Sequence, residues 1–240
     1  MRIEISHNLS KPLVLPLAYQ SILQSIIYRN IRDSEEFGEL HDEGYQYEKR
    51  QFRLFTFSNI FGQAVVYEKN IIFYNKAKWF LSGNNDNFVL NVKRHMEENG
   101  IDYLKQHIND IVCKEQNNQI ETDDLIINMI SPMVAYQTDE VTRKKIYYSP
   151  SDEEFYRLIH DNFVRKYFAY YNKFPESTID LEPINVNSKD KRVTKFKGIY
   201  MTGYKGVYRL FGKKENLNFL YNAGLGSNNS QGFGMFEIMD

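Results

Sequence analysis

A strand-like segment followed by an amphipathic helix opens the chain: MRIEISHNLSKPLVLPLAYQSILQSIIYRN (residues 1–30). Apolar and polar residues alternate over residues 2–9, which is the period of a half-buried β-strand. Pro12 and Pro16 then interrupt the alternation, because proline removes a backbone N–H donor from a strand. From Leu17 to about Asn30, apolar residues recur at helical spacing: Tyr19, Ile22, Leu23, Ile26 and Ile27. The chain is therefore predicted to begin with a strand and a helix that buries one face.

The remainder of the first half continues this succession of strands and helices. Short β-forming segments follow at Phe52–Phe57, Ala64–Tyr67, Ile71–Tyr74 and 77–81. Asp86–Asn99 again has apolar residues at helical spacing and stops at Gly100, and a strand-rich stretch runs to Val112. Strand, helix, two strands, helix and strand is the order of a ferredoxin-like domain.

The second half repeats the order of elements without a residue-level repeat. The polar run Lys114–Thr122 is the best linker candidate. The clearest helix is expected at Ser151–Lys173, with Ser149 or Ser151 as its N-cap. Strands are expected at Leu125–Val134, Lys195–Tyr200, Val207–Phe211 and Phe233–Ile238, and a short helix or strand at Leu217–Tyr221. These patterns predict an α+β chain of two tandem ferredoxin-like (RRM-like) domains with antiparallel sheets, at residues 1–118 and 119–240.

Charge is segregated along a chain that is nearly neutral. With 42% hydrophobic and 25% charged residues, the composition is typical of a soluble globular protein. The net charge is −1, so any nucleic-acid site must be a local basic patch. One such patch is residues 189–214, where Asp190 is the only acidic residue. Its candidate binding cations include Lys191, Arg192, Lys195 and Lys197. The 18 tyrosines and 17 phenylalanines could serve core packing or base stacking.

Several classes of site are excluded or disfavoured by the sequence. The single cysteine, Cys113, excludes an internal disulfide and a cysteine metal cluster. The five histidines show no His-x-x-x-His spacing, so we expect neither a metal site nor a cofactor. No apolar run approaches the roughly 18–20 residues that span a membrane, and no signal-peptide core follows Met1. The expected location is the cytoplasm.

A glycine-rich stretch near the C-terminus, residues 224–234 (GLGSNNSQGFG), is the candidate binding loop and is called the glycine loop below. Two Gly-x-Gly pairs flank five small polar residues, and glycine allows tight turns and close backbone approach. Exposed N–H groups in such a turn can bind phosphate, whereas the alternative is a glycine-bulged hairpin between the last two strands. The candidate binding residues are Gly224, Gly226, Ser227, Asn228, Gly232 and Gly234.

His41 is the candidate acid/base residue, because an imidazole titrates near neutral pH. It lies near the end of an acidic segment, 33–44, that is expected to form a short helix ending at Gly44. Three cations follow closely, Lys49, Arg50 and Arg53, and could stabilise a charged phosphate transition state. The alternative is that His41 only caps a helix C-terminus, where a cationic imidazole is favoured.

Four segments together resemble a known family: the end of the first helix (25–28), residues 40–44, residues 54–58 and the glycine loop. In order and spacing they are similar to the CRISPR-associated precursor-RNA endoribonucleases of the repeat-associated (RAMP) superfamily. The resemblance implies a metal-independent ribonuclease that cuts within the CRISPR repeat. The 2′-hydroxyl would attack the adjacent phosphorus and leave a 2′,3′-cyclic phosphate and a 5′-hydroxyl.

The same resemblance assigns roles to individual residues. His41 matches the general acid/base, Tyr28 a tyrosine found near it in several members, and Lys49 the accompanying cation, for which Arg50 or Arg53 are alternatives. At the end of a helix, Tyr28 could position the nucleophile, and the alternative is a tyrosine of the core. The basic patch and the glycine loop would then contact RNA. The implied partners are repeat RNA, both precursor and mature guide, and other CRISPR-associated effector subunits, with no membrane. The chain is expected to be a monomer or homodimer in a prokaryotic cytoplasm. An inactive repeat-binding relative or a structural subunit of an effector complex remains the alternative.

Overall fold

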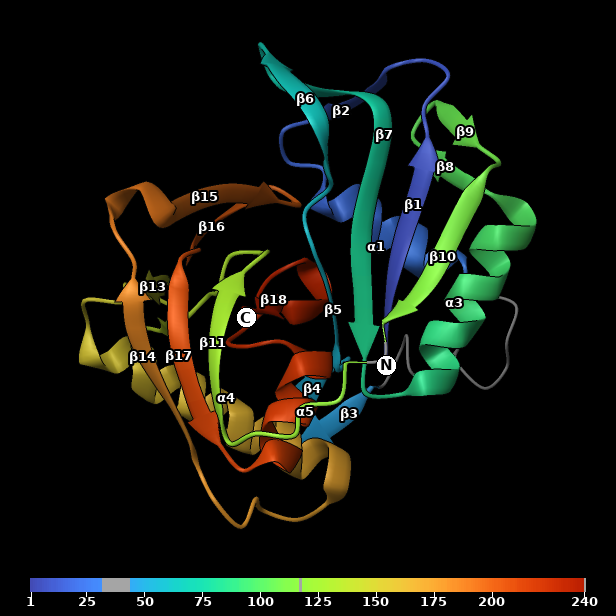
Figure 1. Cartoon of the computed structure of the whole chain (residues 1–240). Helices are drawn as coiled ribbons and strands as arrows, with labels where there is room; N and C mark the ends of the chain where they lie inside the picture. Colours follow the sequence, from blue (N-terminus) through green and yellow to red (C-terminus); the bar gives the residue numbers. More distant parts are fainter. Residues whose placement is uncertain (32–43, 117, 240) are drawn as a thin grey trace.

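Two antiparallel α+β domains lie side by side in the computed structural model, which describes residues 1–31, 44–116 and 118–239 (Figure 1). The helix expected at 33–44, with His41, falls outside the described residues except for Gly44. The principal elements of each domain follow the order strand, helix, two strands, helix and strand, with further short strands between them. The α+β prediction of two ferredoxin-like domains is therefore confirmed.

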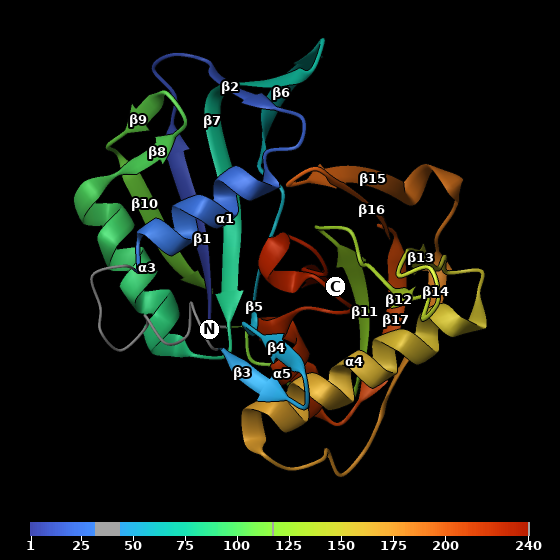
Figure 2. The same ribbon diagram turned by 180° about the vertical axis from the view of Figure 1, so that it is seen from behind.

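The N-terminal domain is a six-stranded sheet covered on one face by two helices (Figure 2). The central strand β7 pairs on one side with β1, which pairs with β10, and on the other with β5 and β6. The amphipathic helix α1 buries Leu23, Ile26 and Ile27, as its apolar spacing predicts. The elements are β1 (Arg2–Asn8), β2 (Leu13–Pro16), α1 (Gln20–Arg29), β5 (Phe55–Phe57), β6 (Phe61–Tyr67), β7 (Asn70–Gly83), α3 (Asp86–Asn99) and β10 (Ile111–Gln116).

The C-terminal domain is a four-stranded antiparallel sheet in the order β14-β17-β11-β18. Its long helix α4 buries Phe155, Ile159 and Phe163, one turn apart, which places them on a single face. The elements are β11 (Asp124–Met129), α4 (Glu153–Tyr171), β14 (Ile179–Asn185), β17 (Val207–Gly212), α5 (Lys214–Ala223) and β18 (Phe236–Ile238).

Among the described residues, four small hairpins and two 3-10 turns lie outside the two main sheets. The β3–β4 hairpin belongs to the first half of the chain but packs on α4 of the second, where Tyr47 contacts Phe168 with ring centroids 5.1 Å apart. The hairpins are β3 (Tyr45–Tyr47) with β4 (Arg50–Phe52), β8 (Ile101–Tyr103) with β9 (Gln106–Ile108), β12 (Tyr136–Thr138) with β13 (Lys145–Tyr147), and β15 (Lys191–Phe196) with β16 (Ile199–Tyr204). The 3-10 turns are η1 (Ser188–Asp190) and η2 (Asn229–Gln231).

The two sheets have separate apolar cores that are joined by buried polar contacts. One core is built from residues 3–113, and the other from residues 120–236 together with Leu54. Arg2, only 3% exposed, donates from β1 to the carbonyls of Phe236 (2.8 Å) and Tyr221 (2.7 Å). Because leaving such buried groups unpaired costs free energy, these contacts fix one domain against the other.

Several predicted boundaries are wrong, for local physical reasons. The segments expected as separate strands at 71–74 and 77–81 form one strand, β7, with a register shift in its pairing with β6 and Asn75 at φ 62°. Helix α4 begins after Asp152, not after Ser149 or Ser151, and the Asp152 carboxylate instead accepts from the Ser149 backbone N–H at 2.7 Å.

The strand expected at Lys195–Tyr200 is also wrong, because it spans the turn of the β15–β16 hairpin. Lys197 and Gly198 both have positive φ, at 45° and 89°, which is the backbone that a two-residue hairpin loop requires. The strand expected at 125–134 ends at Met129, and the one expected at 233–238 begins only at Phe236. The segment 217–221 is helical, within α5. The linker is shorter than expected, since Lys114, Glu115 and Gln116 belong to β10.

Candidate functional site

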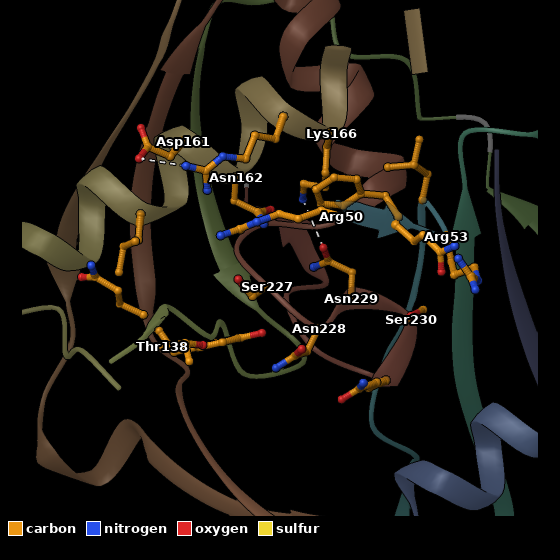
Figure 3. Close-up of a pocket in the computed structure, with 18 of the residues that line it drawn as sticks. Arg50, Arg53, Thr138, Asp161, Asn162, Lys166, Ser227, Asn228, Asn229 and Ser230 are labelled. Carbon is orange, nitrogen blue, oxygen red and sulfur yellow. Dashed lines mark hydrogen bonds and ion pairs between the residues drawn. The ribbon is translucent and has the colours of Figure 1, made fainter. Parts of the chain in front are cut away.

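A groove of about 680 Å³ lies where the two halves of the chain meet (Figure 3). Its walls come from four segments: residues 50–54 of the β3–β4 region, β12 and the loop after it, helix α4, and the glycine loop. Figure 3 shows Arg50 and Arg53 on one side of the opening and Ser227, Asn228 and Ser230 of the glycine loop facing them. The lining cations are Arg50, Arg53, Arg157, Arg165 and Lys166, against the acids Glu140 and Asp161. This charge balance suits a polyanionic ligand.

The cations that line the groove are not equally available to a ligand. Arg157 lies between two acids, with its Nε 2.8 Å from Glu154 and its Nη1 3.0 Å from Asp161. Arg165 is more loosely placed, 3.6 Å from Asp161. Arg50 forms no ion pair with any residue of the described part of the chain, and its side chain is exposed. Arg50 and Arg165 are therefore the cations with most of their charge left for a ligand.

Lys166, which is only 1% exposed, holds the glycine loop in place through hydrogen bonds. Its Nζ donates to the carbonyl of Gly224 (2.5 Å), to that of Gly226 (3.4 Å) and to the side-chain oxygen of Asn229 (3.1 Å). Burial lowers the pKa of Lys166 to about 7, because a charged ammonium is disfavoured away from water. Lys166 thus acts on the conformation of the loop.

The loop glycines are packing positions within the structure. A Cβ on Gly232, at φ +88°, would lie 2.5 Å from the Phe57 ring of the N-terminal domain, and one on Gly234 would overlap the Leu225 carbonyl oxygen. The backbone N–H of Gly234 donates to Pro132, and that of Gly232 to Asn229. Since the loop joins helix α5 to strand β18, the alternative of a glycine-bulged hairpin between the last two strands is excluded. Direct RNA contacts by Gly224, Gly226, Gly232 and Gly234 stay a prediction.

Tyr28, on the last turn of α1, does not line the groove but lies beside two residues that do, Arg53 and Ser230. Its ring packs edge-on against Phe55, with centroids 5.8 Å apart. Burial raises the pKa of the Tyr28 hydroxyl, whereas hydrogen bonds with Arg53 and Ser230 and the Arg53 charge lower it. Gln24, one turn earlier, donates to the Ser230 carbonyl at 2.7 Å. Helix α1, residue 53 and the glycine loop therefore meet at this point.

The other predicted residues lie elsewhere. Lys49 is exposed in the turn of the β3–β4 hairpin and does not line the groove, although its neighbour Arg50 does. The basic residues Lys191, Arg192, Lys195 and Lys197 belong to the β15–β16 region, which arches over the C-terminal sheet (Figure 1). Of the predicted binding residues, the groove brings together Arg50, Arg53, Ser227 and Asn228. The role of each stays a prediction, as does that of His41.

The cations of α4 escaped the sequence-based prediction. Arg157 and Arg165 carry no motif, because charged residues on an amphipathic helix are usually solvated. Lys166 did carry a signal, since it falls among the apolar positions Phe163 and Tyr167 of the predicted helix. A lysine on a buried face needs oxygen partners, and here the glycine loop supplies them.

Two further observations concern the described residues as a whole. No three His, Cys, Asp or Glu side chains among them come together as metal ligands. Within the same residues, no helix has the length and apolar character needed to cross a membrane.

The sequence from 113 to 238 matches the family model described as CRISPR associated protein Cas6, C-terminal. This chain belongs to the Cas6 family. The CRISPR-associated endoribonuclease Cas6 1 of Methanocaldococcus jannaschii is 27% identical over 242 residues, covering 98% of this chain and 91% of that protein. The CRISPR-associated endoribonuclease Cas6 of Pyrococcus furiosus is 35% identical over 89 residues, covering 37% of this chain and 33% of its own length.

The fold is also that of solved RAMP proteins. A structure described as a RAMP protein binding different RNA substrates superposes over the whole of both chains, with a TM-score of 0.83 and 19% identity. At this identity the likeness shows the fold alone. The resemblance to the RAMP endoribonucleases that the sequence indicated is thus confirmed at the level of the family.

Proposed function

We propose that this Cas6-family chain is an endoribonuclease that cuts CRISPR precursor transcripts within the repeat and releases guide RNAs. Family membership and the two curated endoribonuclease relatives support the reaction class. The observation that carries the proposal is the cation-lined groove with Arg53 in its wall and the Tyr28 hydroxyl beside Arg53. Cations in a groove hold a phosphate backbone, and a hydroxyl beside a guanidinium is placed to contact a reacting nucleotide.

The reaction that fits is attack by the RNA's own 2′-hydroxyl on the adjacent phosphorus. The bond to the leaving 5′-oxygen breaks as the new P–O bond forms, giving a 2′,3′-cyclic phosphate and a 5′-hydroxyl. One proton leaves the 2′-hydroxyl and one is delivered to the 5′-oxygen, and His41 is the proposed residue for this acid/base work. No metal ion is required, in keeping with the family that the sequence resembles.

Of the three cations that the sequence left open, we assign Arg53 to the non-bridging phosphate oxygens. Arg53 lines the groove and lowers the pKa of the neighbouring Tyr28 hydroxyl, opposing the effect of burial, whereas Lys49 lies in a hairpin turn and does not line the groove. A guanidinium is planar and always charged, so it suits a phosphate on which charge develops. Arg50, also in the groove, would hold a neighbouring phosphate.

The two halves of the chain would have different roles in catalysis and RNA binding. Residues 1–118 would carry Tyr28, His41 and Arg53, and residues 119–240 would supply the glycine loop and helix α4. The guide RNA would remain the ligand after cleavage, and other CRISPR-associated subunits would receive it.

The test is cleavage of candidate repeat RNAs in EDTA, followed by analysis of the product ends. We expect cyclic phosphate and 5′-hydroxyl ends, and no cleavage when the scissile nucleotide carries a 2′-deoxyribose. Cleavage of the deoxy substrate would refute attack by the 2′-hydroxyl. RNA that is bound tightly but never cut would favour an inactive relative.

A further inference from the structure

A line of three tyrosines runs from the groove across the outer side of the C-terminal domain. Tyr136 lines the groove and faces Tyr147 across the β12–β13 hairpin, with ring centroids 5.7 Å apart. The Tyr147 hydroxyl donates to the backbone carbonyl of Tyr200 on β16, at 3.2 Å. The two hairpins therefore form one continuous surface that begins at the groove, called the tyrosine strip below.

Cations accompany the first and last rings of the tyrosine strip. The Lys145 Nζ lies 4.2 Å from the centroid of Tyr136, and the Lys195 Nζ lies 5.4 Å from that of Tyr200. Neither lysine forms an ion pair with an acid in the described part of the chain. The nearest acid in sequence to Lys145 is Glu140 at the groove, and the nearest to Lys195 is Asp190, which accepts from the Asn187 backbone N–H at 2.9 Å. The charge of both lysines remains available to a ligand.

The outer end of the strip is open to solvent. Tyr200 is 65% exposed, so its ring is not needed for the core of the domain. On the other side of the hairpin, Phe196 and Met201 pack inward near Val134 and Phe233, and Asn228 of the glycine loop contacts the Met201 sulfur at 3.3 Å. The hairpin is thus anchored by its inner face while Tyr200 and Lys195 face outward.

We infer that the tyrosine strip binds an unpaired segment of the RNA and leads it into the groove. Exposed aromatic rings with nearby cations are the composition of single-strand sites, because bases stack on the rings while lysines contact the phosphates. A paired strand keeps its bases stacked on each other and cannot use such rings. Tyr200 and Tyr136 are the proposed stacking residues, with Lys195 and Lys145 on the backbone. The inference rests on the proposed function for the identity of the ligand.

The experiment measures affinity for a repeat RNA that carries 2′-deoxyribose at the scissile nucleotide, so that binding is read without cleavage. Tyr200→Ala should weaken binding about 5- to 150-fold, since stacking on one aromatic ring contributes about 1–3 kcal/mol per base. Tyr200→Trp should retain it. The matched control is Tyr67→Ala, a tyrosine that is 63% exposed on β6 of the N-terminal domain, which should bind as wild type.

A second arm uses the same RNA annealed to its complement. Tyr200→Ala should leave affinity for this duplex unchanged, whereas Lys195→Ala should reduce the salt dependence of single-strand binding by about 0.7 in slope. Wild-type affinity of both Tyr200→Ala and Tyr136→Ala for the single strand, with melting temperatures unchanged, would overturn the inference. If the wild type binds in this way but never cuts its RNA, the proposed function fails and the tyrosine strip stands.

Discussion

Replacing Lys166 with methionine tests how the glycine loop is kept in place. Methionine has a similar length and an apolar tip, so it fills the same buried space without a donor. The change removes the three hydrogen bonds to Gly224, Gly226 and Asn229. The change leaves these buried oxygens unpaired, at a cost of about 1–3 kcal/mol each. Part of this cost is offset because the variant no longer has to bury the charge of the lysine ammonium. We expect a net loss of about 2 kcal/mol at pH 7.

The loss in the free energy of unfolding should also depend on pH. Burial lowers the pKa of Lys166 in the folded state to about 7, whereas a lysine in the unfolded chain titrates at its ordinary pKa of 10.5. Between these values the unfolded state binds more protons, so the stability contributed by Lys166 rises with pH. It is fully present above about pH 10.5 and is lost as the pH falls toward 7. The slope is about 1.4 kcal/mol per pH unit.

The assay is urea unfolding of wild type and Lys166→Met at pH 7 and pH 9. Other titrating groups are common to both proteins and cancel in the difference between them. The destabilisation should be about 2–3 kcal/mol larger at pH 9 than at pH 7. An equal difference at the two pH values would refute a lowered pKa and show that the oxygens keep the ammonium charged. A variant as stable as wild type would refute the bracing role itself.

Three further predictions concern positions elsewhere in the two domains. Gly232→Ala should cost about 2–4 kcal/mol in thermal unfolding, because the added methyl meets a ring of the other domain, whereas Gly198→Ala has open space and should cost only about 1–2 kcal/mol of backbone strain. Burial lowers the pKa of His7 to about 4. Between pH 6.5 and pH 4 the unfolded state therefore binds a proton that the folded state does not, and the free energy of unfolding of wild type should fall by up to about 3 kcal/mol relative to that of His7→Phe. Parallel plots of the free energy of unfolding against pH for the two proteins would contradict this. Arg53→Ala should lower single-turnover cleavage about 100-fold or more and Lys49→Ala only a few-fold, and the reverse order would return the transition-state role to Lys49.

The ferredoxin-like order could be predicted from the sequence because its signals are local. The spacing of apolar residues predicts a helix at residues 17–30 and another at 86–99, and Gly100 predicts where the second one ends. The predicted strand boundaries were wrong where a tight turn separates two strands. Lys197 and Gly198 form a two-residue loop inside a run of β-forming residues, and only their positive φ separates the two strands.

The groove could not be predicted, because residues from opposite ends of the chain build it. Arg50 and Ser227 face each other only after α4 and the β3–β4 hairpin have packed together. The glycines of the loop stand out in the sequence, but a sequence cannot distinguish a glycine that lets a ligand approach from one that lets Phe57 approach. That choice depends on the neighbouring domain.

Single-turnover cleavage of a repeat RNA by His41→Ala, beside wild type, tests the central claim most directly. Removal of a general acid/base slows a reaction by about 10²–10⁴-fold, so cleavage should fall at least 100-fold while affinity for the 2′-deoxy RNA stays within a few-fold. Cleavage by His41→Ala at the wild-type rate, with the same product ends, would contradict the assignment of this chain as a histidine-dependent repeat endoribonuclease.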